Sequence, residues 1–364
     1  MSFKRKFLRI SGLIIPFQEW FFKFIIENRN ISEKSALREK LWALRKGFFL
    51  ETVKLCGITK ENYRDYMRDR AYLNLHPFNK QYSSIIDSKL FLPFLLKDYP
   101  EVVPEYYFLI NDGRLVRLDR GLSEKENLLS LCKGKKKLVL KPAWGTKGVG
   151  FHLLEYTERG LLLNGKESEK KELDGFIRTH NHYLITQYIE QHTYSSDINA
   201  SSVNTVRISL YRDINDGRFH LAGSFHRFGR AGYLVDNTVS KGGGIVVLID
   251  IESGKLLKLG LSREKGRYSR KIKVTVHPDS GVSIAGVEIP GWQSMIKKIL
   301  GIFNHLSFLS YVGLDIVVTR EGFKIIEINS MPGINAFQLE SGILKDENLG
   351  NFFTHRMLQK NSGL

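Results

Sequence analysis

Residues 311–329 read YVGLDIVVTREGFKIIEIN and contain two predicted β-strands. The strands cover Tyr311–Val318 and Phe323–Asn329, and both are rich in the β-branched and aromatic residues that favour extended structure. The polar segment 320–322 between them ends in glycine and is typical of a turn. The sequence here therefore predicts a β-hairpin whose strands pair in one sheet.

Polar side chains interrupt this hairpin. Glu327 and Asn329 are two residues apart and project to the same face of their strand, while Ile326 and Ile328 face a core. Strand pairing brings Asp315 alongside the two polar residues. Charged groups inside apolar strands are costly to bury without a partner, and two carboxylates with an amide oxygen suit Mg²⁺ shared with nucleotide phosphates. The alternative is two acids exposed on one sheet face.

A glycine-rich motif, KPAWGTKGVG, occupies residues 141–150 at the end of an apolar strand. Glycines let backbone N–H groups approach phosphate oxygens closely. Lys141 leaves the strand and Lys147 lies in the loop, so each can place positive charge on phosphates. The lysine precedes the glycines and no helix follows, which excludes a Walker A loop. The alternative is a hairpin whose glycine turn leaves its lysines exposed.

The remaining pattern predicts further strands, many of them in hairpins, and a few helices. Further strands are expected at 105–110, 115–118, 151–155, 183–189, 205–212, 219–228 and 244–251. Helices are expected at about 123–132, 167–175, 291–306 and 346–358. Many hairpin-forming strands with few helices predict an α+β fold and not a doubly wound parallel sheet.

The start of the chain differs from the rest in composition. The formal net charge of the whole chain is +17, and the first 80 residues hold about half of this excess. Apolar residues recur at helical spacing over 37–49 and 63–75. The predicted divisions are a basic helical region over 1–90, a first lobe over 91–190 and a second lobe over 191–364. The positive charge favours anionic partners such as nucleotides, nucleic acid or an acidic membrane.

The cysteines and the apolar N-terminal stretch point to a cytoplasmic protein. Cys56 and Cys132 have no neighbouring cysteine, which fits a reduced compartment. The stretch Leu13–Ile26 is interrupted by charged residues and is not followed by a small-residue cleavage site, so it does not resemble a signal peptide.

Within residues 1–28, apolar side chains recur at helical spacing downstream of basic residues. These side chains are Phe17, Trp20, Phe21, Phe24 and Ile25. The pattern is typical of an amphipathic helix that lies on an anionic membrane. The alternative is a helix docked on the rest of the protein. The first interpretation gives the protein a peripheral contact with the inner face of the membrane.

The order of these motifs resembles that of the ATP-grasp superfamily and, more narrowly, of the sugar-transfer-associated ATP-grasp family found with polysaccharide biosynthesis. The resemblance covers roughly residues 100–340. Its stretches are Lys141-Pro142, Asn204-Thr205-Val206-Arg207, Val235-Asp236-Asn237, Gly242-Gly243, His277-Pro278, Ile289-Pro290-Gly291-Trp292 and Glu327–Gly333. The first 90 residues do not match the Rossmann-like domain that precedes the grasp lobes in many superfamily members.

This resemblance implies two α+β lobes that hold ATP between their sheets. Residues for the α- and β-phosphates would be Lys141, Gly145, Thr146, Lys147, Gly148 and Gly150. The hinge between the lobes, contacting adenine and ribose, would be Gln187, Tyr188, Ile189 and Glu190. The Mg²⁺ ligands would be Asp315, Glu327 and Asn329.

The resemblance also assigns roles to cations in the middle of the chain. Arg207 and Arg227 would stabilise the γ-phosphate and the oxyanion of a tetrahedral intermediate. Lys241 would contact the nucleotide, and Arg230 would add positive charge. From the residues alone, an isolated arginine is more often the partner of a surface ion pair.

Together these features predict an ATP- and Mg²⁺-dependent carboxylate–amine ligase that acts through an acylphosphate. The resemblance implies that an amino acid or small acid is joined to a sugar of a surface polysaccharide, with a lipid-linked glycan as one form of the acceptor. Two alternatives remain: a kinase that phosphorylates a hydroxyl, and a non-catalytic basic adaptor for membrane or nucleic acid. The basic run 133–137 lacks the interleaved aromatic residues that nucleic-acid binding favours.

Overall fold

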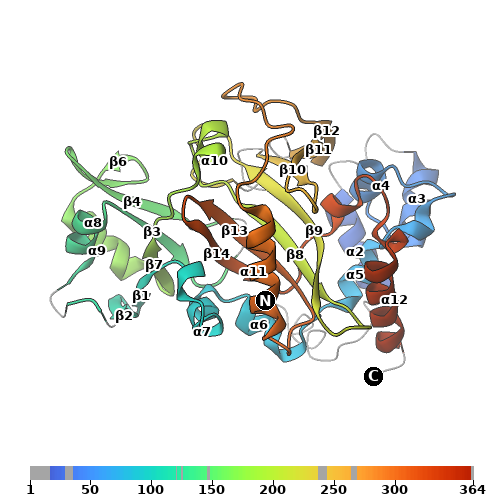
Figure 1. Cartoon of the computed structure of the whole chain (residues 1–364), viewed down its shortest axis with the longest axis horizontal. Coiled ribbons are helices and arrows are strands. Elements are labelled where there is room, and N and C mark those ends of the chain that lie inside the picture. Colours follow the sequence, from blue (N-terminus) through green and yellow to red (C-terminus); the bar gives the residue numbers. More distant parts are fainter. Residues whose placement is uncertain are drawn as a thin grey trace.

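The computed structural model describes residues 17–28, 36–119, 121–123, 126–145, 148–236, 244–263 and 269–361. Its strands form two antiparallel sheets, and the helices between residues 17 and 75 lie at the far end of the second sheet from the first (Figure 1). The predicted α+β fold with a helical N-terminal region is confirmed. Within the described ranges, no helix is both long and apolar enough to cross a membrane.

The first sheet has seven strands in the described residues, in the order β2-β1-β7-β3-β4-β5-β6. The strands are β1 (Tyr106–Asn111), β2 (Arg114–Arg117), β3 (Lys137–Pro142), β4 (His152–Thr157), β5 (Gly160–Leu163), β6 (Lys166–Glu167) and β7 (Tyr183–Gln187). Helices α8 (Leu128–Lys135) and α9 (Lys170–Thr179) share one apolar core with this sheet. The predicted helix start at Ser123 is wrong, because the Asn127 side chain accepts from Leu129 N and Ser130 N and caps α8 there.

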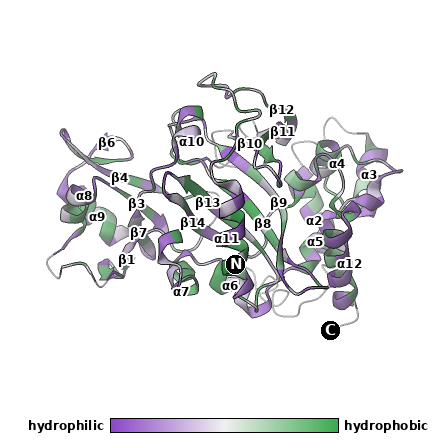
Figure 2. Ribbon diagram, viewed as in Figure 1, coloured by the Kyte–Doolittle hydropathy of each residue, from purple (hydrophilic) through white to green (hydrophobic). Residues whose placement is uncertain are grey.

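The second sheet also has seven strands in the described residues, in the order β12-β11-β10-β9-β8-β13-β14. They are β8 (Val206–Arg212), β9 (Phe219–Phe228), β10 (Ile245–Ile249), β11 (Leu256–Arg263), β12 (Ser269–Lys273), β13 (Tyr311–Thr319) and β14 (Gly322–Asn329). Helix α10 (Thr193–Ile198) joins the lobes, and α11 (Trp292–Asn304) packs its apolar face against the sheet. Figure 2 shows hydrophobic segments along the central strands β8 and β13, interrupted by polar residues.

Alternation along β8 and β13 separates two environments. Ile208 and Leu314 belong to the core shared with α11. Arg207 and Asp315, one residue along, face the opposite side and line a cavity. Because successive side chains of a strand point to opposite faces, one face of the sheet packs in the core and the other face carries the charged groups.

The N-terminal region packs against the second sheet. Its helices are α2 (Phe17–Asn28), α3 (Leu37–Lys46), α4 (Leu50–Cys56), α5 (Asp69–Leu75), α6 (Ser83–Ile86) and α7 (Leu92–Leu95), with short 3₁₀ turns at Tyr63–Asp65, Lys80–Tyr82, Lys89–Phe91 and Pro100–Val102. Helix α12 (Glu347–Asn361) and the turns Asn335–Gln338 and Ile343–Lys345 complete this side of the molecule. Met67 and Tyr72 share a core with Tyr311 and Phe352, so the two ends of the chain pack together.

Two further sequence expectations fail at the level of local structure. Residues 63–75 were expected to be helical throughout, but Arg68 is extended and separates a 3₁₀ turn from α5. Ile326 was expected in the core, yet it lines the cavity. A register shift between Asp315 and Ile316 pairs Ile316 with Ile325, so the alternation of β14 is interrupted at Ile326.

Candidate active site

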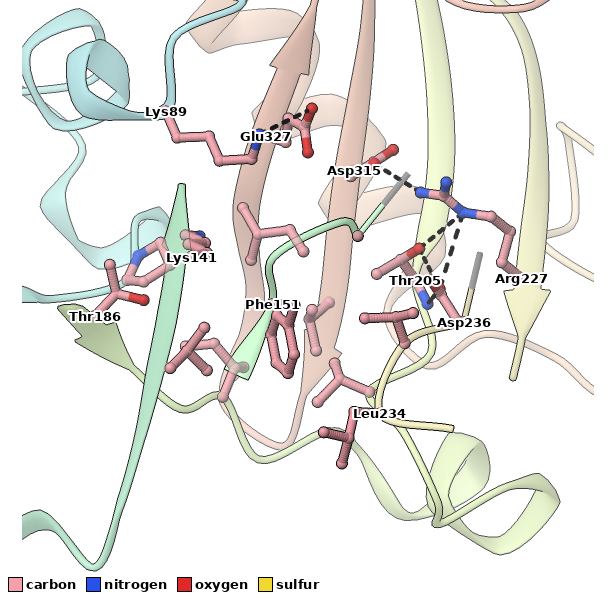
Figure 3. A pocket seen from close by; sticks show the side chains of 18 of the residues that line it. Lys89, Lys141, Phe151, Thr186, Thr205, Arg227, Leu234, Asp236, Asp315 and Glu327 are labelled. Carbon is pink, nitrogen blue, oxygen red and sulfur yellow. Dashed lines mark hydrogen bonds and ion pairs between the residues drawn. The ribbon is translucent and has the colours of Figure 1, made fainter. Parts of the chain in front are cut away.

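A cavity of about 480 Å³ lies between the two sheets. The first lobe contributes the end of β3, the glycine-rich loop and the start of the segment that leaves β7. The second lobe contributes β8, β9, β13 and β14. Figure 3 shows charged side chains converging on this space from both lobes and from the N-terminal region.

Three charged residues form a row across neighbouring strands of the second sheet. Arg207 in β8 pairs with Asp315 in β13, and Asp315 pairs with Glu327 in β14. Directly paired residues in antiparallel strands project from the same face. The register of two antiparallel strand pairs, β8–β13 and β13–β14, therefore places a cation and two carboxylates side by side, as the sequence predicted for the carboxylates.

Asp315 is held by two arginines. Arg207 Nε donates to Asp315 Oδ1, and Arg227 Nη2 lies 2.7 Å from Oδ2. Burial opposes ionisation of Asp315, but the two guanidinium groups outweigh it and hold the pKa of this carboxyl below its usual range. Asp315 is therefore a buried carboxylate that stays charged.

A second acid extends this network. Arg227 Nε donates to Thr205 Oγ1 at 3.0 Å and lies 3.8 Å from Asp236 Oδ2. Asp236 Oδ2 also accepts from Thr205 N at 2.7 Å. Burial raises the pKa of Asp236, with Arg227 acting in the opposite direction. The guanidinium of Arg227 is thus fixed between two carboxylates at the edge of the cavity (Figure 3).

Glu327 contacts a lysine that sequence reasoning missed. Lys89 Nζ lies 3.4 Å from Glu327 Oε1 and donates to Gly145 O at 2.7 Å. Lys89 N also donates to Ala143 O at 2.9 Å. One lysine from the N-terminal region therefore touches both lobes at the cavity. No local motif marks it, because the turn that carries it owes its position to tertiary packing.

Asn329 has an unsatisfied amide. Its Nδ2 atom is buried and has no hydrogen-bond partner among the described residues. A buried polar group without a partner is costly, and its presence at a cavity indicates a missing ligand. Ser330, the next residue, is held by Asp87, whose carboxylate accepts from Ser330 N and Ser330 Oγ, both at 2.7 Å.

The oxygen groups of Asp315, Glu327 and Asn329 fit a divalent cation. All three groups are hard oxygen ligands, and they project from one face of the sheet. Burial raises the pKa of Glu327, and a bound cation would lower it again. Among the described residues no cluster of three or more His, Cys, Asp or Glu offers a metal site. The set therefore depends on the asparagine as its third member.

Lys141 faces this row from the first lobe. The pKa of Lys141 is lowered to about 8, mainly by burial and also by nearby Lys89, while Glu327 opposes the shift. Its Nζ lies 5.9 Å from the centroid of the Tyr106 ring, and no ion pair to Lys141 occurs among the described residues. A desolvated ammonium without a fixed counter-charge is suited to an incoming anion.

The glycine-rich loop approaches the second lobe. Gly148 has a φ of +65°, and a Cβ built on it would lie 3.0 Å from a methyl group of Val235. Gly150 has a φ of +79° and would clash with the Tyr183 hydroxyl at 2.6 Å. Both positions therefore require glycine. Thr146, Lys147 and Lys241 lie outside the described residues.

The segment after β7 closes the apolar end of the cavity. Gln187, Tyr188 and Ile189 line it, together with Phe151 and other apolar side chains. Glu190 is exposed and does not appear among the described lining residues. Apolar side chains that line this part of the cavity suit a flat heterocycle. Arg230 instead forms an ion pair with Asp279 at 2.8 Å and does not line the cavity.

The family model described as sugar-transfer associated ATP-grasp matches residues 68–351, more than half of the chain. The chain belongs to this family. The two-sheet cavity is accordingly the interlobe site of an ATP-grasp fold, which confirms the fold expected from the motifs. The match begins at Arg68, so the family model includes the last part of the helical region.

Solved structures with a similar fold show low sequence identity to this sugar-transfer associated ATP-grasp protein. D-alanyl-alanine synthetase A from Vibrio cholerae is 12% identical, with a TM-score of 0.42, over 78% of this chain and 67% of that one. L-amino acid ligase from Bacillus licheniformis is 10% identical, with a TM-score of 0.36, over 70% of this chain and 43% of that one.

N5-carboxyaminoimidazole ribonucleotide synthetase from Thermotoga maritima is 12% identical, with a TM-score of 0.35, over 69% of this chain and 44% of that one. The chain thus spans less than half the length of two of these three proteins. A comparison with curated proteins gives no match.

Proposed function

We propose that this protein is an ATP- and Mg²⁺-dependent carboxylate–amine ligase that joins an amino acid or similar small acid to a sugar. The observation that carries the proposal is the row Arg207–Asp315–Glu327 facing the unpaired ammonium of Lys141 across one cavity. Family membership supports ATP as the co-substrate, and the description of the family supports a sugar acceptor.

In this proposal the first lobe binds the nucleotide. Lys141 and Lys89 place two ammonium groups near the phosphates, and backbone N–H groups at Gly148 and Gly150 approach phosphate oxygens. The backbone at Gln187–Ile189 accepts and donates hydrogen bonds to adenine. Mg²⁺ bound by the Asp315, Glu327 and Asn329 side chains would neutralise charge on the phosphates during transfer.

The second lobe stabilises charge on the acid substrate. The γ-phosphoryl group moves to a carboxylate oxygen of the acid, the bond to the β-phosphate breaks, and ADP leaves. An amine then attacks the acylphosphate carbon, and phosphate departs as the amide bond forms. Arg207 and Arg227 line the cavity and stay charged beside Asp315, so their guanidinium groups can stabilise the oxyanion of this step.

An isotope experiment tests the reaction type. The full-length protein is incubated with ATP, Mg²⁺, candidate amino acids labelled with ¹⁸O in the carboxylate, and amino-sugar acceptors. A ligase that acts through an acylphosphate transfers one ¹⁸O to the released phosphate. A kinase leaves the phosphoryl group on its product and releases no labelled phosphate, which would overturn the ligase proposal.

A variant that keeps the shape of the site provides the control. Glu327→Gln removes one carboxylate from the row without changing side-chain length, and we expect it to abolish acid-dependent ADP release. If wild type and variant show the same ATP binding in calorimetry and neither turns over ATP, the non-catalytic adaptor replaces the enzyme as the better account.

A further inference from the structure

Helix α2 is docked on the protein by one face. Trp20 and Phe24 are buried in the core that also contains Leu44. Trp20 Nε1 donates to Leu44 O at 3.1 Å, and Asn28 Oδ1 accepts from Leu50 N at 2.7 Å. These contacts fix the rotation of the helix about its own axis, so its remaining faces are defined.

A second apolar face of the same helix points away from the protein. Phe22 and Ile26 are 65% and 59% exposed, and Phe21 and Ile25 are 40% and 48% exposed. Their spacing of one, four and five residues places them on adjoining positions of one helix surface. The Phe21 and Phe22 rings lie 6.2 Å apart in an edge-on arrangement. We call these four residues the α2 patch.

Charged residues occupy a third strip of the helix. Glu19, Lys23 and Glu27 follow one another at intervals of four, between the docked face and the α2 patch. A surface helix of a soluble protein normally needs only one apolar face. The sequence left a choice between a docked helix and a membrane-binding helix. The structure shows that the docked face leaves four of the large apolar side chains of the helix unused.

We propose that the α2 patch inserts into the surface of an anionic phospholipid membrane. Charge complementarity favours lipid over other occupants: the segment KRKFLR at residues 4–9 precedes the helix in the sequence, and the whole chain carries a formal charge of +17. Basic residues beside an apolar helix face bind anionic lipid by electrostatic attraction and apolar insertion acting together. Nothing in this step depends on which reaction the cavity catalyses.

Vesicle co-sedimentation of the full-length protein tests the proposal. The vesicles contain phosphatidylcholine alone or phosphatidylcholine with phosphatidylserine. We expect binding only to the second kind, and we expect it to weaken as salt is raised. The variant F22S/I26S removes two large side chains from the α2 patch and should bind at least about tenfold more weakly, because apolar insertion contributes in proportion to the area buried.

A matched double variant controls for general surface hydrophobicity. F94S/L358S removes side chains that are 65% and 63% exposed on two other helices, α7 and α12. This variant should bind phosphatidylserine vesicles as the wild type does. Equal binding by the wild type and both variants would overturn the proposal.

The melting temperature and the mass in solution exclude the other occupants. Neither should change in F22S/I26S if lipid is the partner, since the docked face of α2 is untouched. A clear fall in melting temperature would mean that another part of this chain covers the α2 patch. A change from dimer to monomer would mean that a second copy covers it. Either result, without a loss of vesicle binding, would replace the membrane as the occupant.

Discussion

On the second-lobe wall of the cavity, Asp315 contacts Arg207 and Arg227, so its charge is balanced before any ligand binds. On the first-lobe wall, Lys141 is buried without such a counter-charge among the described residues, and burial lowers its pKa to about 8. The contrast shows two ways of preparing a site for a charged ligand. On the second-lobe wall, the ion network around Asp315 is already formed and holds its geometry. On the first-lobe wall, the ammonium of Lys141 gains a charged partner only when an anionic ligand binds.

Breaking the network should have the largest effect on both stability and activity. Asp315→Asn leaves two buried guanidinium groups without their anion, and we expect the free energy of unfolding to fall by about 3 to 5 kcal/mol. ATP turnover should fall on the order of 10²–10³-fold. Denaturant unfolding and ADP release measure the two effects.

Asp279→Asn is the control for this variant, because Asp279 forms an equivalent ion pair with Arg230 at 2.8 Å on a more exposed part of the surface. A surface pair contributes about 1 kcal/mol or less. Equal losses in the free energy of unfolding would show that the Asp315 network stabilises the protein no more than a surface ion pair does.

Replacing Lys141, which has no ion-pair partner among the described residues, should weaken ATP binding and leave the free energy of unfolding almost unchanged. Lys141→Met loses a charge-assisted contact with phosphate worth about 1.5 to 3 kcal/mol, so ATP affinity should fall about 10- to 100-fold in calorimetry. The melting temperature should stay the same or rise, because no folded-state partner is lost. The control variant Lys255→Met, whose lysine pairs with Glu288 at 3.0 Å outside the cavity, should bind ATP normally.

The lowered pKa of Lys141 also predicts how affinity depends on pH. The free protein loses the Lys141 proton as pH rises through about 8, so ATP affinity should fall by about tenfold between pH 7 and pH 9. The stability contribution has the opposite sign: burying the charged amine costs stability below pH 8, and this cost fades between pH 8 and the unfolded value near 10.5. Lys141→Arg should remove most of the decline in affinity, and a flat wild-type profile would contradict the assignment.

Asp87, which holds Ser330 behind the second-lobe wall, should have a moderate effect on turnover when it is replaced. Asp87→Ala removes both hydrogen bonds to Ser330, which follows Asn329, and should lower kcat about tenfold through misplacement of that amide. Asp250→Ala is a close match, because Asp250 accepts from Ser253 N and Oγ at 2.7 and 2.6 Å in a remote turn. A kcat loss in both variants would mean that Asp87 acts only through general stability.

The smallest effect on ATP affinity should come from a substitution at Gly148 in the glycine-rich loop. Gly148→Ala places a methyl group against Val235 and strains a backbone with a φ of +65°. Gly281→Ala carries a similar φ of +70° in open space. We expect about a threefold loss of ATP affinity in the first variant only, since the backbone penalty of about 1 kcal/mol is common to both. An equal loss would assign the effect to backbone strain.

The sequence predicted the parts of the site that depend on strand alternation. Asp315 and Glu327 were expected side by side from the period of two along paired strands, and the structure places them together. Arg207 was expected on a strand, but its pairing with Asp315 joins distant parts of the chain and was not predicted. Ile326 was misplaced because a register shift cannot be read from an apolar run. Lys89 was missed for another reason: its position follows from how the N-terminal region packs, which no local pattern encodes.

The helices of the first 90 residues were also predicted in part and missed in part. Helical spacing predicted α3, which ends at Gly47 in the left-handed conformation. It failed over 63–75, where tertiary contacts such as the hydrogen bond from Met67 N to Gln338 Oε1 compete with helix formation. Apolar side chains on α2 were recognised, but their division into a docked face and an exposed face depends on Leu44 and Leu50 as partners.

That contact between Met67 and Gln338 joins residues 271 positions apart, and it has a consequence during synthesis on the ribosome. At about 5 to 20 residues per second, Met67 emerges roughly 15 to 55 s before its partner exists. Each sheet is built from one continuous stretch of chain and can close in turn, whereas the N-terminal helices must wait for β13 and α12. Their apolar surfaces, Tyr72 among them, stay open to chaperones until α12 has been synthesised.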